Sequence, residues 1–315
     1  MREKSEIPLT YILGSGRSGS TILDATLGNH PSVVSVGELG NAVVSGWGSN
    51  QPCACGESVD DCEWWAAVKE KWFAGLEGPT LEEYYQLQTK FERIRSIPKH
   101  FGARDEAFVR YESYTVGLFE AIRDVSGASV VVDSSKGLGR AVALASTRGL
   151  DVRIIHLVRD PRGVCNSMAK ALKKNLGAGV QDDLSAVPVW RTAFEWFVYN
   201  LLCLLAVAKG SRGLTLRYEE FVASPVEVLR RLERELGESM EALVQKFRND
   251  SSISFCHQMA GNRVRMTGNV LLKMDRSWAH QLSLRQRILI ILLTSPLFFF
   301  LGYRWGPGHG IEDSA

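Results

Sequence analysis

The stretch Gly14-Ser15-Gly16-Arg17-Ser18-Gly19-Ser20-Thr21 decides the fold of this chain. The apolar run Leu9 to Leu13 precedes it, and Ile22 to Leu27 follows with a composition typical of the first turns of a helix. A strand, a glycine-rich turn and a helix N-terminus in this order gather backbone N–H groups where the helix dipole favours negative charge. The sequence therefore predicts a loop that holds a phosphate-like anion.

The loop has the glycine spacing of a P-loop but lacks its lysine. Gly14 and Gly19 match the outer glycines of that motif, and Ser20-Thr21 stands where it has Lys-Ser or Lys-Thr. Because that lysine holds β- and γ-phosphates, we do not expect hydrolysis of a nucleoside triphosphate. Arg17 stands inside the loop, and its planar guanidinium suits a phosphate or sulfate. A glycine turn without a ligand is the less favoured alternative.

Composition limits the class of protein. Of the 315 residues, 45% are hydrophobic and 23% charged, as in a soluble globular protein with one large α/β domain or two small ones. The net charge of +2 gives no support for a nucleic-acid partner bound through bulk charge, so a local site must hold any anion. Residues 1–8 contain no apolar leader, which predicts a cytoplasmic protein with mainly reduced cysteines.

Strand and helix patterns alternate along the chain. The predicted strands are Leu9–Leu13, Val33–Val36, Val130–Val132, Ile154–Val158 and Leu214–Leu216. Apolar runs of this kind, separated by helical segments, favour an α/β fold with a parallel sheet covered by helices. We therefore predict a single domain over residues 1–315.

Two segments depart from this alternation. Residues 46–125 carry aromatic-rich helical patterns between the second and third strands, and we predict a cap-like insertion over the site. Its aromatic side chains either form core or line an acceptor site. The second segment is an apolar C-terminal helix at about 277–305, in which Ile288 to Leu301 carries no charge. That run is short for a membrane span and Pro296 interrupts it, which predicts a buried or membrane-surface helix.

Three of the six cysteines, Cys53, Cys55 and Cys62, fall in one short segment. Three thiols can contribute to a zinc site, but the sequence shows no evident fourth ligand. A local disulfide or simple packing explains them at least as well, and we assign no metal-binding residue.

Charged side chains follow three of the predicted strands directly. Glu38 comes just after the second strand, Lys136 ends the third in Asp133-Ser-Ser-Lys136, and Arg159 follows the fourth. Ligand-binding groups gather at the carboxyl ends of parallel strands. Glu38 is therefore a candidate general base and Lys136 a candidate partner for charge on a transferring group, with simple solvation as the alternative for both. Ser167 lies two helical turns beyond Arg159, so the pair could reach one anion.

Four segments in this order resemble the PAPS-dependent sulfotransferases, where PAPS is 3′-phosphoadenosine 5′-phosphosulfate. They are the loop with Arg17, the Asp133–Lys136 strand end, Arg159 with Ser167, and Arg217–Pro225. The likeness runs from about Tyr11 to Trp278 and is weakest over residues 46–125. It implies the P-loop-like architecture of that family and transfer of a sulfuryl group from PAPS to an acceptor hydroxyl of a lipid, carbohydrate or phenol.

The resemblance also implies which residues bind the donor. The 5′-phosphosulfate would be held by Gly14, Ser15, Gly16, Arg17, Ser18, Gly19, Ser20 and Thr21. Arg159 and Ser167 would bind the 3′-phosphate. The remaining nucleotide contacts would come from Tyr218, Gly261, Asn262, Arg263 and Arg265, in a turn that departs from the cytosolic enzymes' version.

The resemblance further assigns the chemistry. Cytosolic members use a histidine base, whereas the tyrosylprotein branch uses a glutamate at the spacing from the loop arginine seen here, which favours Glu38 over His30. Arg17 and Lys136 would stabilise the charge of an in-line transfer with help from Ser135, and no metal is required. A P-loop small-molecule kinase and a non-catalytic nucleotide-binding module are the alternatives. The expected partners are a small-molecule or lipid-like acceptor and, through the C-terminal helix, a membrane surface.

Overall fold

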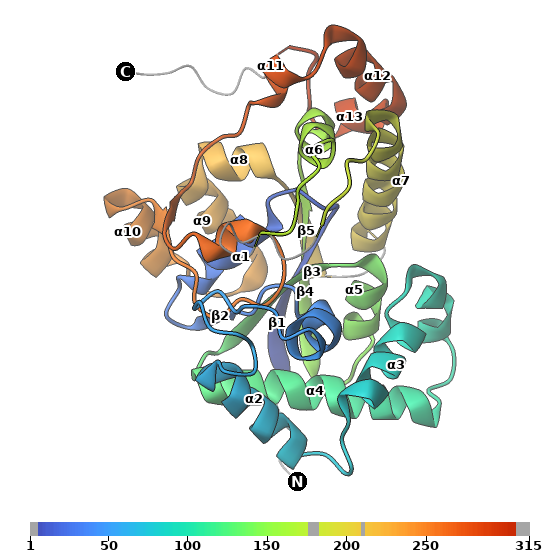
Figure 1. Ribbon diagram of the computed structural model, residues 1–315, viewed down its shortest axis with the longest axis vertical. Coiled ribbons are helices and arrows are strands. Elements are labelled where there is room, and N and C mark those ends of the chain that lie inside the picture. Colours follow the sequence, from blue (N-terminus) through green and yellow to red (C-terminus); the bar gives the residue numbers. More distant parts are fainter. Residues whose placement is uncertain (1–5, 176–182, 209–211, 307–315) are drawn as a thin grey trace.

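Five parallel strands form the central sheet of the computed structural model, which describes residues 6–175, 183–208 and 212–306 (Figure 1). The strands are β1 (Ile7–Leu13), β2 (Val33–Ser35), β3 (Val130–Lys136), β4 (Leu150–Val158) and β5 (Arg212–Arg217). Their order in the sheet is β2-β3-β1-β4-β5, with every pair parallel. The predicted α/β fold is confirmed, and each predicted strand is present. Because β1 is central, the loop after it lies in the middle of the sheet's carboxyl edge.

Helices cover both faces of the sheet, since successive side chains of a strand point to opposite faces. Leu9 and Tyr11 of β1 pack under one helical layer, and Ile12 packs under the other. The first layer contains η2 (Ala42–Gly48), α2 (Glu63–Ala74), α3 (Leu81–Phe91), α4 (Glu106–Ser126) and α5 (Leu138–Ala145). The second contains α1 (Ser20–Gly28), α8 (Tyr218–Ala223), α9 (Pro225–Leu236) and α10 (Glu241–Asn249).

The predicted cap over the site is wrong for most of residues 46–125. The largest aromatic side chains of α2, α3 and α4 are buried in one cluster with the sheet: Trp65, Trp72, Tyr84, Tyr111 and Tyr114. Burying these rings stabilises a helical layer more than exposing them at a site would, so the aromatic pattern marks core. Only Ile94, at the start of η3 (Ile94–Phe101), lines a cavity beside the anion loop.

The predicted C-terminal helix at 277–305 is three helices: α11 (Trp278–Gln281), α12 (Leu284–Thr294) and α13 (Leu297–Phe300). Ser283 begins α12 with a capping box, in which its side chain accepts from Gln286 N–H and Gln286 accepts in return. Pro296 separates α12 from α13, because proline lacks the N–H that a continuous helix needs. α12 packs against α6 (Pro161–Met168) and α7 (Val189–Ala208), as Figure 1 shows.

α7 is long and apolar enough to cross a membrane by length and composition alone. In this fold, however, it contacts β4 and β5, and its Trp196, Asn200 and Cys203 are buried. We therefore describe α7 as a helix of the domain with one covered face and one exposed apolar face. Two short strands, β6 (Ser252–Ile253) and β7 (Val270–Leu271), pair antiparallel and flank η5 (Arg263–Met266).

Candidate active site

The loop between β1 and α1 is shaped by close contacts that only glycine permits. A Cβ atom on Gly19 would lie 2.3 Å from the Tyr218 ring, and one on Gly14 would lie 2.4 Å from the carbonyl oxygen of Leu157. Gly19 also has a φ of 91° at the start of α1, a conformation that residues with a side chain rarely adopt. No side chain caps the start of α1, so N–H groups there are available to an anion.

A cavity of about 520 Å³, which we call the loop cavity, opens beside this loop. Most of the residues predicted to act on the donor line it: Gly16, Arg17, Gly19, Ser20, Thr21, Glu38, Lys136, Arg159, Ser167, Tyr218, Gly261 and Asn262. They come from the ends of β1, β2, β3 and β4, the first residues of α1 and α8, the face of α6, and the turn before η5. The fold thus gathers at one edge of the sheet side chains that are widely separated in sequence.

Glu38 and Lys136 form an ion pair in the loop cavity. The Lys136 ammonium donates to Glu38 Oε1, and Asn41 Nδ2 donates to Oε2 at 3.0 Å. A backbone hydrogen bond fixes the position of Glu38: its N–H donates to the Met259 carbonyl at 2.9 Å. The Lys136 carbonyl in turn accepts from the Tyr199 hydroxyl at 2.7 Å. A fixed carboxylate and a fixed ammonium therefore stand together at the anion loop, and these two groups can accept a proton and stabilise negative charge.

Arg17 projects from the loop into a partly buried position. Burial lowers its pKa, the nearby Glu38 carboxylate opposes that change, and Arg263 lowers the pKa further. The guanidinium nonetheless stays protonated at neutral pH, because its ordinary pKa is far above 7. Arg17 is thus a permanent cation beside the loop amides, while Arg263 is exposed on η5 and does not line the loop cavity.

Arg159 is 8% exposed and tied to three different groups. Its guanidinium donates to the Arg17 carbonyl at 3.0 Å and to Asp275 Oδ2 at 2.9 Å, and it lies over the Tyr218 ring at 4.9 Å. Asp275 also lines the loop cavity, although sequence reasoning did not single it out. This carboxylate neutralises Arg159, and a phosphate would compete with it for the same guanidinium donor.

Comparison with known proteins identifies the fold and the family. Residues 8–242 match the sequence model of the sulfotransferase family. This chain belongs to the sulfotransferase family. Together with the loop cavity and its charged groups, that membership makes the protein a sulfotransferase enzyme.

One solved sulfotransferase domain shares the architecture at low sequence identity, and a second matches over a similar share of this chain. The sulfotransferase domain from the curacin biosynthetic pathway is 17% identical and has a TM-score of 0.52, with 95% of this chain and 99% of that chain covered. The sulfotransferase domain from the Synechococcus PCC 7002 olefin synthase is 18% identical, covering 94% of this chain and 96% of that one, with a TM-score of 0.48. None of the curated proteins matches the sequence significantly. The first likeness supports the fold alone.

The sulfotransferase has a second cavity, of about 590 Å³, which Gly14, Ser15 and Gly16 of the loop also line. This apolar cavity lies between the loop and α7, and its apolar lining residues are Ile94, Val164, Met168, Phe194, Trp196, Val198, Tyr199 and Leu202. It shares Gly16 and Lys136 with the loop cavity. The sequence shows α7 as an apolar helix, but only its packing beside the loop reveals that it lines a cavity.

Several predicted site residues do not line the loop cavity. Ser135 lines the apolar cavity instead, where its hydroxyl donates to Asp133 and accepts from Gly40 N–H at 2.7 Å, so its proton is already engaged. Ser18 is buried and exchanges a hydrogen bond of 2.8 Å with Ser15. These two loop serines and Gly14 do not line the loop cavity, although Gly14 and Ser15 line the apolar one.

Arg265 and His30 also stand apart from the loop cavity. Arg265 was predicted to contact the nucleotide, but it is 1% exposed and donates to the Pro52 carbonyl at 2.7 Å, so this assignment is corrected. Both arginines of η5 were assigned to the nucleotide, but Arg263 is exposed whereas the Arg265 side chain is buried in the protein. His30 accepts from Ser32 N–H at 3.2 Å just beyond α1, at the end opposite the loop.

Proposed function

We propose that this sulfotransferase moves the sulfuryl group of PAPS to a hydroxyl group of an acceptor with an apolar body. The observation that carries the proposal is that the loop cavity and the apolar cavity share Gly16 and Lys136, beside the Glu38 carboxylate. A donor in one cavity and an acceptor in the other would meet at this junction. Transfer between them needs both reactants held in line, which two cavities sharing a wall would provide.

The donor fits the loop cavity by charge. The loop amides and Arg17 suit the 5′-phosphosulfate, while Arg159 and Ser167 line the same cavity and suit a 3′-phosphate. In the transfer, the acceptor oxygen forms a bond to sulfur as the bond from sulfur to the bridging phosphate oxygen breaks. Glu38 takes the acceptor's hydroxyl proton, and adenosine 3′,5′-bisphosphate leaves. Lys136 and Arg17 would stabilise the negative charge that grows on the bridging and equatorial oxygens.

The acceptor proposal rests on the lining of the apolar cavity. Phe194, Val198 and Leu202 line it at helical spacing along α7. Such a wall favours an aliphatic or aromatic body, with the acceptor hydroxyl directed toward Lys136 and Glu38. A lipid-like alcohol or an alkyl phenol fits this chemistry better than a free sugar.

Donor binding gives the first prediction. We expect adenosine 3′,5′-bisphosphate to raise the thermal unfolding midpoint without Mg²⁺, and to do so more than adenosine 5′-phosphosulfate, which lacks the 3′-phosphate. The physical reason is that Arg159 exchanges its contact with Asp275 for a phosphate. The measurement is a thermal-shift titration of both ligands against the same protein.

The test variant for this prediction is Arg159→Met, which should remove the difference in stabilisation between the two ligands. The matched control is an arginine nearby in sequence. Arg153→Met changes an arginine within β4, the strand that Arg159 directly follows; Arg153 pairs with Asp151 at 3.2 Å, and its variant should leave the difference intact. Equal stabilisation by both ligands would contradict the assignment of Arg159. Stronger stabilisation by ATP with Mg²⁺ would instead favour a kinase.

We also propose that this enzyme contacts a membrane. The contact would be made by an apolar surface on α12 and α13, which lies beside the exposed face of α7. Leu292 is 70% exposed and Phe300 is 78% exposed. Exposed apolar side chains gathered on neighbouring helices favour insertion into a lipid surface, and Arg285 on α12 adds attraction to anionic lipid. We expect the protein to float with phosphatidylserine-containing vesicles and the Leu292→Asp/Phe300→Asp variant to float much less.

The control for the flotation experiment is Leu271→Asp. Leu271 is 69% exposed but lies on β7, which pairs with β6 and does not belong to this surface. Its variant should float like the wild type. Wild-type protein that stays in the soluble fraction at both low and high salt would contradict membrane contact, and core packing of α12 against α7 would then be its whole role.

A further inference from the structure

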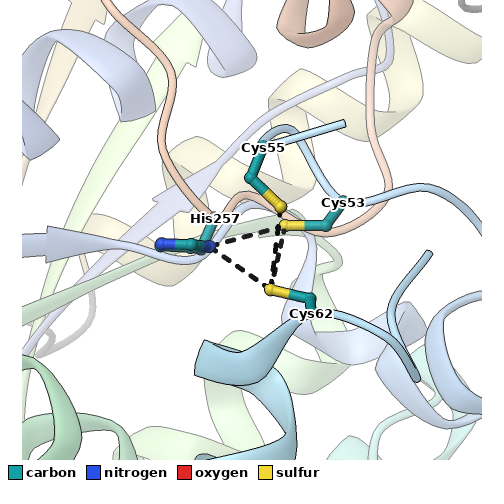
Figure 2. A group of neighbouring side chains, drawn as sticks. All are labelled: Cys53, Cys55, Cys62 and His257. Carbon is teal, nitrogen blue, oxygen red and sulfur yellow. Dashed lines mark hydrogen bonds between the residues drawn. The ribbon is translucent and has the colours of Figure 1, made fainter. Parts of the chain in front are cut away.

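Cys53, Cys55, Cys62 and His257 meet in a cluster outside both cavities (Figure 2). Cys53 and Cys55 come from one loop, Cys62 immediately precedes α2, and His257 approaches on the turn that follows β6. One potential ligand atom from each residue lies within 4.8 Å of the others. The fourth ligand missing from the cysteine-rich segment is therefore supplied from almost two hundred residues further along the chain.

The separations within the cluster match those of a tetrahedral zinc site. Cys55 Sγ and Cys62 Sγ are 3.7 Å apart, and Cys62 Sγ and Cys53 Sγ are 3.9 Å apart. His257 Nδ1 lies 3.4 Å from Cys62 Sγ and 3.8 Å from Cys53 Sγ. A tetrahedron with Zn–S bonds of about 2.3 Å and Zn–N bonds of about 2.0–2.1 Å requires S–S edges of about 3.8 Å and S–N edges of about 3.6 Å. The four separations given above differ from these edges by about two tenths of an ångström or less, and the two remaining pairs of ligand atoms lie within 4.8 Å.

The same distances exclude a disulfide in this arrangement. A bonded pair of sulfur atoms lies about 2.05 Å apart, far less than the 3.7 and 3.9 Å between these sulfur atoms. All three cysteines are free thiols, and three sulfurs with one imidazole nitrogen are a donor set that selects zinc over magnesium or calcium.

Neighbouring groups hold the ligands in place. The Trp64 ring stacks on the His257 ring at 5.2 Å with an interplanar angle of 5°, and Trp65 Nε1 donates to the His257 carbonyl at 2.9 Å. The Cys53 N–H donates to the Glu57 carbonyl at 2.8 Å, closing the turn that carries Cys55. Supports of this kind orient the ligands of metal sites.

Arg265 provides an independent observation on charge. It is almost fully buried, it donates to the carbonyl of Pro52 next to Cys53, and its Nε and Nη2 atoms have no hydrogen-bond partner among the described residues. A lone buried cation is costly. Zinc with three thiolates and a neutral histidine carries a net charge of −1, which would neutralise Arg265.

We propose that Cys53, Cys55, Cys62 and His257 form a structural zinc site that fixes residues 257–262 against the active site. Met259 exchanges backbone hydrogen bonds with Val36 and Glu38 at 3.0 and 2.9 Å, and Asn262 N–H donates to Thr21 Oγ1 at 3.3 Å. Zinc therefore anchors one end of the segment that holds Glu38 and lines the loop cavity. Four protein ligands leave no open position, so the ion has a structural role and none in the transfer itself.

The test is the zinc content of the full chain, measured by inductively coupled plasma mass spectrometry after purification under reducing conditions. We expect about one zinc per chain, as for a closed four-ligand site. Cys55→Ser and His257→Ala should lose most of this zinc after dialysis against a chelator and unfold at a lower temperature. Cys55 is exposed, so its substitution opens no cavity in the core. His257→Cys should retain the zinc, because four cysteines form an equally good site.

The matched control is Cys256→Ser, which removes an exposed thiol next to His257 and should keep both the zinc and the unfolding temperature. Wild-type protein that takes up no zinc after reduction and incubation with a zinc salt would overturn the proposal. Equal zinc content in the wild type, Cys55→Ser and His257→Ala would also overturn it, as would a disulfide among the three cysteines found by mass spectrometry after alkylation without reductant. Zinc content is read without activity, so this test is independent of the proposed reaction.

Discussion

Replacing Glu38 by glutamine is expected to lower turnover by roughly 10²-fold or more while leaving donor affinity nearly unchanged, the effect of losing a positioned proton acceptor. Glutamine keeps the shape of the side chain and its contact with Asn41, but it cannot take a proton from the acceptor hydroxyl. The carboxylate is the group best placed for that step, because it lines the loop cavity and pairs with Lys136. Donor binding should persist, since Arg17 and Arg159 remain.

The measurement is turnover with saturating PAPS and an alkyl phenol or lipid-like alcohol, together with adenosine 3′,5′-bisphosphate affinity by calorimetry. His30→Ala is the control, because His30 lies beyond the end of α1 opposite the loop and lines neither cavity. It should cost far less turnover than Glu38→Gln. Near-normal turnover of Glu38→Gln combined with an inactive His30→Ala would show that the assignment of the base is wrong.

Lys136→Met should lower turnover by about 10²–10³-fold, the range seen when one charge-stabilising donor is removed from an active site. Methionine retains the length of the side chain but not the ammonium, which stands at the junction of the two cavities. Its loss leaves Arg17 and the loop amides to stabilise the negative charge of the transition state without the ammonium. The turnover number should therefore fall more than the affinity for the donor.

Single-turnover measurements with labelled PAPS separate these two quantities. Lys246→Met is the control, since Lys246 is a partly buried lysine paired with Asp250 on α10, away from the site. Because Lys136 and Glu38 contact each other, their substitutions should be less than additive in the double variant. An unchanged turnover number with weakened donor binding would show that Lys136 helps to bind the donor but does not stabilise the transition state.

Local patterns in the sequence were sufficient for the fold class and the anion loop. Leu9 to Leu13 reads as a buried strand, and Gly14 and Gly19 mark backbone positions that admit no side chain. The strand and the glycine spacing are local patterns and so are visible in the sequence, although the contacts that exclude a side chain at the two glycines come from Leu157 and Tyr218, far along the chain. Alternation of such strands with helices was enough to predict a parallel sheet, because parallel strands need crossover connections.

Local patterns failed where burial decides the outcome. The aromatic residues of α2 to α4 look alike whether they form core or a cap, and only their packing on the sheet distinguishes the two. Arg265 and Arg263 occupy the same turn, yet one is buried and the other exposed. Pro296 was visible as an interruption of the apolar C-terminal run, but its result, two separate helices packed near α7, depends on tertiary contacts.

The sequence by itself determined the elements of this enzyme: the loop, the strand ends that carry Glu38 and Lys136, and the cysteine-rich segment. Only the tertiary structure decided which of them meet. The strand order β2-β3-β1-β4-β5 places β3 between the strands that precede the loop and Glu38, which brings Lys136 to both. The same folding carries His257 to the three cysteines. The physical reason is that such contacts arise from burial of both sheet faces over the whole chain, and no short stretch of sequence encodes that.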